Sequence, residues 1–171
     1  MITTRATFPL GKYVTMEVKD FENQHIEVIF VQTVYEQNLL KKKEFSLTLR
    51  RFQQVLRSLE DIKQAVKDHQ DGKEVHYMKH LGANRYVQVN TGFRVVDLRE
   101  FWLPEGKNTV QPTRRGIALK FEEFETLIQL DFERILPELK TTTPCMFSED
   151  HQNQLGYLMC AECNPDDYMN W

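Results

Sequence analysis

The chain of 171 residues has little cysteine, little glycine or proline, and no long apolar segment. Its three cysteines are Cys145, Cys160 and Cys163, all after residue 140. No apolar run approaches the roughly 20 residues of a membrane span, and Met1–Phe8 lacks the apolar core of a secretory signal. These absences predict a protein of the reducing cytosol or nucleus, without a membrane segment, whose cysteines are thiols or metal ligands.

Positive charge is missing from the end of the chain. Residues 141–171 contain no lysine or arginine but five acidic residues. The net charge of −3 therefore hides a slightly basic body, because residues 1–140 hold 22 basic and 20 acidic residues. The excess is concentrated in residues 73–119, with 8 basic against 4 acidic. Such a segment suits an anionic partner, although ordinary solvated surface charge is the alternative.

The body contains an internal repeat with an offset of 71 to 72 residues. Equivalent positions are Gly11 and Gly82, Val18 and Val89, Lys43 and Arg115, and Phe52 and Phe124. Each copy has alternating strand-like segments, a basic turn and one amphipathic helix, which predicts an α+β fold of two β-β-β-β-α units. The predicted organisation is a first repeat over 1–70, a linker over 71–77, a second repeat over 78–140 and an acidic tail over 141–171.

Hydrophobic periodicity places the main elements. Alternation predicts strands over 13–18, 24–34 and 44–49 in the first copy, and over 85–89, 93–102 and 116–119 in the second. Apolar residues at three- and four-residue spacing predict a helix that begins near Thr48, whose side chain can act as N-cap. A second helix is expected from Phe121 to the residues before Pro137. Phe52 and Phe124 are expected in the core.

Three motifs in the second copy resemble the C-terminal domain of the positive cofactor four family. They are Val96–Trp102 (VDLREFW), Pro104–Gly106 (PEG) and Arg114–Leu119 (RRGIAL). In the first copy, Phe8–Lys12 and Val18–Phe21 are similar to the same family, whereas the later strands match poorly. The resemblance implies a curved four-stranded antiparallel sheet with a helix across its back. It also implies an intramolecular pseudo-dimer, because both units lie on one chain.

The function that the resemblance implies is that of a nuclear transcriptional coactivator that binds single-stranded DNA. The expected partners are single-stranded DNA or a melted duplex, together with the transcription machinery. Higher assembly of the pseudo-dimer stays open. Two alternatives remain: an RNA-binding protein, and a protein-interaction module that has kept the scaffold but lost most nucleic-acid binding. No enzyme is expected, because the sequence has no phosphate loop, nucleophile elbow or metalloprotease helix.

The resemblance also implies the residues of a binding site. Trp102 matches a tryptophan that contacts bases in the family, and Arg114 and Arg115 match a basic turn that holds phosphate. Lys42 and Lys43 replace this turn in the first copy. The full predicted set of nucleic-acid-binding residues is Lys12, Lys19, Phe21, Lys42, Lys43, Arg99, Trp102, Arg114 and Arg115.

Each assignment has a structural alternative. Trp102 can pack beneath the following loop, and Arg99 can pair with a neighbouring carboxylate. Phe21 can be a core residue, and the lysines can protect an edge strand from aggregation. The two copies also differ, because Val34 or Tyr35 lies nearest to the position of Trp102. The predicted site is therefore asymmetric.

The tail suggests one further site. Cys160 and Cys163 have the Cys-x-x-Cys spacing of a zinc-binding edge, and Cys145 and His151 would complete a Cys3His set. The alternative is an acidic tail with incidental thiols, whose carboxylates compete with DNA for the basic sheet or bind a partner. No other cofactor is expected.

Overall fold

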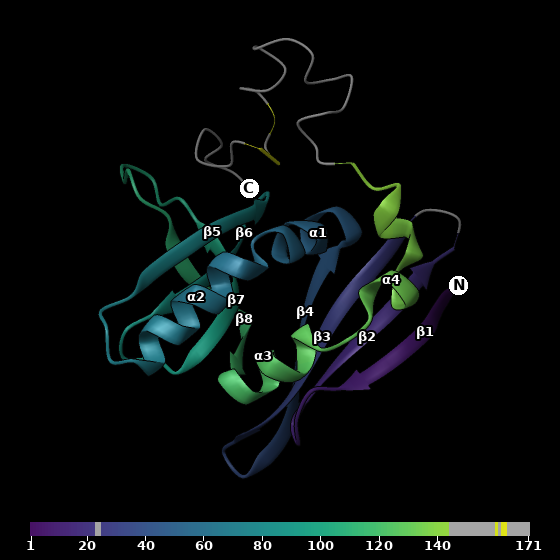
Figure 1. Cartoon of the computed structure of the whole chain (residues 1–171), viewed down its shortest axis with the longest axis horizontal. Helices are drawn as coiled ribbons and strands as arrows, with labels where there is room; N and C mark the ends of the chain where they lie inside the picture. Colours follow the sequence, from purple (N-terminus) through teal and green to yellow (C-terminus); the bar gives the residue numbers. More distant parts are fainter. Residues whose placement is uncertain (23–24, 144–159, 161, 164–171) are drawn as a thin grey trace.

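The computed structural model describes residues 1–22, 25–143, 160, 162 and 163. Within this part of the chain there are two four-stranded antiparallel sheets, each followed by helices (Figure 1). The predicted α+β fold of two β4-α units is confirmed. The first sheet contains β1 (Ile2–Pro9), β2 (Val14–Phe21), β3 (His25–Glu36) and β4 (Leu39–Thr48); the second contains β5 (His76–Gly82), β6 (Arg85–Asn90), β7 (Val95–Trp102) and β8 (Gln111–Lys120).

The structure divides each expected helix. α1 (Leu49–Arg57) is followed by α2 (Leu59–Gln70), and α3 (Phe121–Ile128) by α4 (Phe132–Ile135) and the 3-10 helix η1 (Pro137–Lys140). The predicted N-cap is confirmed, because Thr48 Oγ1 accepts a hydrogen bond of 3.3 Å from Arg51 N. The first break falls at buried Ser58. The second break lies between α3 and α4, where Asp131 is the N-cap of α4 and its Oδ1 accepts a hydrogen bond of 3.3 Å from Arg134 N.

Four strands, β1, β4, β5 and β8, lie partly or wholly outside the segments that periodicity predicted. β1 was not predicted, because Ile2–Pro9 is rich in threonine and lacks apolar alternation. β4 begins at Leu39, so Lys41–Lys43 lie in a strand rather than in a basic turn. The turn before it is formed by Gln37 and Asn38, both with positive φ (53° and 62°). β8 likewise contains Arg114 and Arg115, and β5 begins at His76, inside the expected linker.

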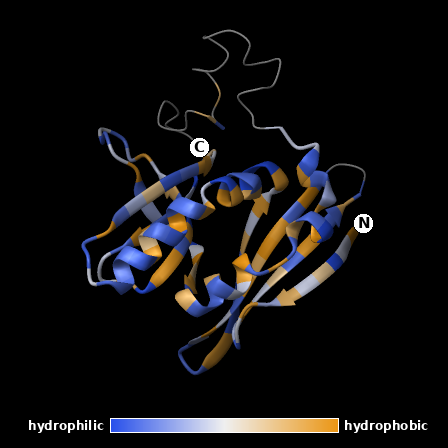
Figure 2. Cartoon of the chain, viewed as in Figure 1, coloured by the Kyte–Doolittle hydropathy of each residue, from blue (hydrophilic) through white to orange (hydrophobic). Residues whose placement is uncertain are grey.

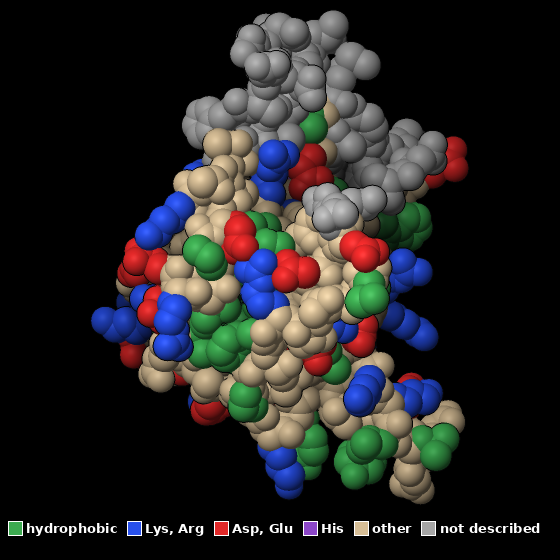
Figure 3. All heavy atoms as spheres, turned by 90° about the vertical axis from the view of Figure 1, so that its right-hand side faces the viewer, with side chains coloured by type: hydrophobic (Ala, Val, Ile, Leu, Met, Phe, Trp, Pro, Cys, Tyr) green, Lys and Arg blue, Asp and Glu red, His purple; other side chains and the backbone are tan. Residues whose placement is uncertain are grey.

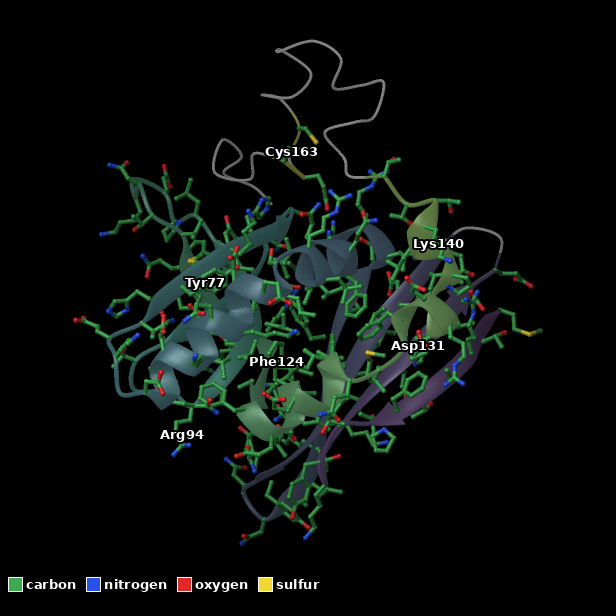
Figure 4. All side chains as sticks on the ribbon, in the orientation of Figure 1. Tyr77, Arg94, Phe124, Asp131, Lys140 and Cys163 are labelled. Atoms are coloured by element: carbon green, nitrogen blue, oxygen red, sulfur yellow. The ribbon has the colours of Figure 1, made fainter. Side chains whose placement is uncertain are left out.

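One cluster of buried apolar side chains runs through both units. Figure 2 shows apolar and hydrophilic residues alternating along the strands and helices that enclose it. Phe52 and Phe124 are almost completely buried, as expected, and Figure 4 shows Phe124 on α3 among the central side chains. Phe52 also meets Phe132 of α4 edge-on, with ring centroids 5.4 Å apart. The core is therefore shared and does not belong to either unit alone.

The helices reach across between the units. α2 follows the first sheet but lies over the second, close to β6 (Figure 1). In the opposite direction, Glu138 of η1 accepts a hydrogen bond of 2.7 Å from Arg5 of β1. Near the middle, His69 of α2 meets Phe121 of α3 with ring centroids 5.2 Å apart. These contacts pack the two units against each other.

Strands β4 and β8 meet at the junction of the two sheets. Arg85 Nε donates to Ser46 O at 2.9 Å, and Gln32 Nε2 donates to Ala118 O at 3.5 Å. Ser46 and Ala118 occupy equivalent positions of the repeat, because they are 72 residues apart. The junction thus has approximate two-fold symmetry, while the donors that cross it differ.

Candidate nucleic-acid interface

A hollow of about 640 Å³ lies on the second sheet, on the face turned away from the helices. Its position follows from strand alternation, since Val87, Val89, Val96 and Leu98 point into the core and their neighbours point outward. The lining comprises Gln88, Asn90, Phe93, Val95, Asp97, Arg99, Pro112, Thr113, Arg114 and Ala118. This lining combines polar, apolar and basic groups on one sheet face.

The floor of the hollow is a hydrogen-bonded series of polar side chains. Buried Asp97 accepts from Arg99 at both carboxylate oxygens, with distances of 2.9 and 3.0 Å. Gln88 Nε2 donates to Asp97 Oδ2 at 2.7 Å, and Asn90 Nδ2 donates to Gln88 Oε1 at 3.0 Å. Arg99 also donates to Thr113 O at 2.8 Å. These hydrogen bonds join the floor side chains to one another, and the Asp97 carboxylate partly neutralises the charge of Arg99.

An irregularity in β8 separates the two neighbouring arginines. Between the pairs Arg99–Gly116 and Phe101–Pro112, β8 uses more residues than β7. Thr113 Oγ1 closes this bulge by donating to Glu100 O at 2.8 Å. Arg114 then lines the hollow, whereas Arg115 Nη1 lies 3.8 Å from Glu100 Oε2. The structure brings Arg99 and Arg114 together and directs Arg115 elsewhere.

The aromatic residue at the hollow is Phe93, which is 68% exposed. Trp102, the last residue of β7, is 49% exposed and lies outside the hollow's described lining. Phe101, next to it, instead packs against Tyr86 with ring centroids 5.0 Å apart. Sequence reasoning did not assign Phe93 to the site. The available signal was Gly92, whose positive φ of 94° turns the chain before Phe93.

Gln88 and Asn90 were also not predicted. Both are outward-facing residues of β6, and strand alternation alone identifies that face without indicating a site. Arg94, which follows Phe93, points away from the body at the edge of the second unit (Figure 4). The turn between β6 and β7 therefore presents one aromatic and one basic side chain next to each other.

The predicted residues of the first unit lie in different surroundings. Lys12 Nζ sits 5.3 Å from the centre of the Tyr13 ring, and Lys19 pairs with Glu17 at 3.2 Å. Phe21 stacks on His25 with ring centroids 4.8 Å apart. It lines a smaller hollow of about 330 Å³ that also contains Asp20 and Glu22. The structure does not bring this group together with Arg99 and Arg114.

Lys42 and Lys43 lie on the β3–β4 hairpin, opposite Thr33 and Gln32. The tip of this hairpin exposes three large hydrophobic side chains, Tyr35, Leu39 and Leu40. Figure 3 shows hydrophobic and basic side chains gathered at the lower projection of the molecule, where Figure 1 places this hairpin. Glu36 has a lowered pKa because Lys41 binds it at 2.9 Å, with smaller effects from Lys43 and Arg114. β4 of the hairpin also contacts β8, the strand that carries Arg114.

Part of the tail contacts both units. The Glu162 carboxylate accepts two hydrogen bonds from Arg51 of α1, at 2.7 and 2.8 Å, which raises the pKa of Arg51. Ala83 N, in the turn between β5 and β6, donates to Glu162 O at 3.0 Å. Arg85 lies close by, and its pKa is lowered by burial and by the charge of Arg51. Glu162 therefore links the first helix to the second sheet.

The predicted zinc ligands are only partly described. Cys145 and His151 lie outside the described residues. Cys160 and Cys163 belong to one turn, in which Cys163 N donates to Cys160 O at 3.2 Å. Within the described ranges, no three His, Cys, Asp or Glu side chains form a metal-binding cluster. The zinc site stays a prediction.

Comparisons with known proteins identify the second unit. Residues 79–130 match the family model described as Transcriptional Coactivator p15 (PC4), whereas no curated protein and no solved structure matches the chain. Across the described residues, none of the helices has the length and apolarity needed to span a membrane. The match runs from β5 to just beyond α3 and includes every residue that lines the hollow. The second unit of this chain is therefore similar to the Transcriptional Coactivator p15 (PC4) family over residues 79–130, and the first unit repeats the β4-α arrangement of the second.

Proposed function

We propose that this protein is a nuclear transcriptional coactivator that binds single-stranded DNA through the outer face of its second sheet. The family match suggests a DNA-binding coactivator without enzymatic activity. The observation that carries the finer proposal is the hollow, where exposed Phe93 stands beside Arg99 and Arg114. An aromatic face and nearby cations are the two features that unpaired bases and their phosphates require.

The roles of these residues follow from their surroundings. Phe93 offers its ring to a base, because it is exposed at the edge of the hollow. Arg114 is the best phosphate ligand, since it lines the hollow and is exposed, whereas Arg99 is held by Asp97. Arg99 then contributes mainly by shaping the floor. Binding of single-stranded DNA is thus expected to depend on Phe93 and Arg114 more than on Arg99.

The first sheet is a weaker candidate. By register, its outer face carries Glu17, Glu27 and Glu44 against Lys19 and Lys42. Lys19 is moreover paired with Glu17. An excess of carboxylates disfavours phosphate, so this sheet is expected to add little affinity on its own.

Titration of a fluorescently labelled oligo-dT strand with the full chain tests this function. We expect binding at low salt, weakened about 5- to 150-fold by Phe93→Ala, as the loss of one stacked base implies. Phe21→Ala, which removes an aromatic ring from the first unit, is the matched control and should change affinity little. Absence of binding at low salt, or equal losses for the two variants, contradicts the proposal.

A protein-interaction function is the second candidate, and the exposed apolar tip of the β3–β4 hairpin favours it. Tyr35, Leu39 and Leu40 are each more than half exposed and adjoin Lys41–Lys43. A Leu39→Ser/Leu40→Ser double variant should then lose a partner from the transcription machinery and keep its DNA affinity. If instead the wild type binds uridine strands as tightly as deoxythymidine strands, RNA is an equally suitable ligand.

A further inference from the structure

The polar floor of the hollow has a fixed direction. Asp97, as a carboxylate paired with Arg99, can only accept hydrogen bonds. Gln88 must therefore turn its NH2 group towards Asp97, which leaves its oxygen for Asn90. Asn90 must in turn direct its NH2 group towards Gln88. One buried ion pair thus sets the orientation of two amides along β6.

The series ends with an acceptor. Because Asn90 Nδ2 is directed to Gln88 Oε1, its Oδ1 is the atom that remains for a ligand, and no described residue donates to it. The lining of the hollow also contains the guanidinium groups of Arg99, which Asp97 holds, and of exposed Arg114. The hollow therefore combines the Asn90 acceptor with cationic donors, and a polar edge of a ligand can contact both.

We propose that this hollow selects unpaired bases that present a carbonyl oxygen next to a ring N–H, namely thymine, uracil and guanine, over cytosine and adenine. This inference rests on the proposed function and names the ligand of its site. The ring N–H donates to Asn90 Oδ1, the carbonyl oxygen accepts from an arginine, and Phe93 stacks on the base. An amino base places its NH2 group where the arginine donors point, so that two donors oppose each other.

The test compares affinities of the full chain for dT and dC strands of equal length, at neutral pH and fixed salt. Wild type should favour dT by about fivefold or more, the effect of one hydrogen bond. Asn90→Leu, which has similar size but no acceptor, should bring the dT/dC ratio close to one. Asp97→Asn should also lower the ratio, because Gln88 is then no longer forced into one orientation.

Phe93→Ala is the matched control, because it should weaken both strands and leave the ratio unchanged. A far-ultraviolet spectrum and a urea unfolding curve establish that each variant is folded. Binding with a wild-type ratio near one overturns the inference and leaves the proposed function standing, and so does a ratio that Asn90→Leu does not change. Failure to bind either strand overturns the proposed function and the inference together.

Discussion

Arg99 lies directly against Gly116 on the neighbouring strand. A Cβ atom at position 116 would be 2.9 Å from Arg99 Cβ and 2.7 Å from Leu98 O. The absence of a side chain at Gly116 therefore lets the Arg99 stem lie flat and reach Asp97. In the first copy the equivalent pair is Val31 and Glu44, so no such arrangement forms there. The two sheets thus differ at this position because the second has Gly116 where the first has Glu44.

Gly116→Ala should destabilise the protein by about 1–3 kcal/mol, because the new methyl group meets a backbone carbonyl that cannot move aside. Urea unfolding measures this loss. Glu44→Ala at the equivalent exposed position should stay within about 0.5 kcal/mol of wild type. Equal stabilities of the two variants would show that the close packing at Gly116 carries no energetic weight.

Arg114→Gln should reduce the salt dependence of DNA binding, because Arg114 lines the hollow and Arg115 is directed to Glu100. Loss of one phosphate contact lowers the slope of log K against log salt by about 0.7 for a single strand. Arg115→Gln, with the same charge change one residue away, is the control. If Arg115→Gln reduced the salt dependence more than Arg114→Gln, the bound DNA would lie on the other side of β8.

Sequence periodicity predicted the architecture well, because the repeat and the alternation of Val18, Val89 and their neighbours reflect burial directly. It did not predict β1, whose threonines pair with β2 through the backbone rather than through an apolar face. Periodicity also did not predict the irregular pairing of β7 and β8. The bulge at Thr113 separates Arg114 from Arg115, although the sequence places them side by side.

Site residues were harder to find than elements. Arg99 was predicted as a nucleic-acid-binding residue, and in the structure it pairs with the carboxylate of Asp97. Its role in binding stays a prediction. Gln88 and Asn90 were not predicted, because outward polar residues on a strand look the same whether they face solvent or a hollow. Their role depends on which strand lies beside them, which is a property of register and not of local sequence.

Phe93→Ala should weaken binding of a short dT strand more than Trp102→Ala, because Phe93 lines the hollow and Trp102 does not. The expected loss for Phe93→Ala is about 1–3 kcal/mol, one stacked base. Trp102→Ala should affect only longer strands that extend past the end of β7. Fluorescence anisotropy with two strand lengths separates these effects. If the shorter strand depends mainly on Trp102, the strand lies outside the hollow.

Glu162→Gln should lower the free energy of unfolding by about 1.5–3 kcal/mol, because half-buried Arg51 loses a charged partner that makes two hydrogen bonds. The nearby charge of Arg85 makes the loss larger. Glu60→Gln, which alters an exposed pair with Lys63, is the control and should cost less than about 0.5 kcal/mol. A neutral Glu162→Gln variant would mean that the tail contact does not stabilise the folded chain.

The Tyr77 hydroxyl should make the free energy of unfolding decrease at alkaline pH. It lies on β5 (Figure 4), and burial raises the pKa of its hydroxyl above the ordinary value of 10.0, with the Ser58 hydroxyl opposing this shift. A raised pKa means that the folded state holds its proton while the unfolded state releases it. The stabilising contribution is therefore complete below pH 10 and is lost as the pH rises through the folded-state pKa.

Tyr77→Phe should remove this dependence, so that the variant's free energy of unfolding falls less steeply than that of wild type above pH 10. Urea unfolding at several pH values between 8 and 11 measures the difference, with Tyr35→Phe as the control because Tyr35 is exposed on the hairpin tip. The tyrosine absorbance at alkaline pH gives a second reading, since a component with a raised pKa should be missing from Tyr77→Phe. Identical alkaline slopes for wild type and Tyr77→Phe would show that the Tyr77 hydroxyl ionises as easily in the folded chain as in the unfolded one.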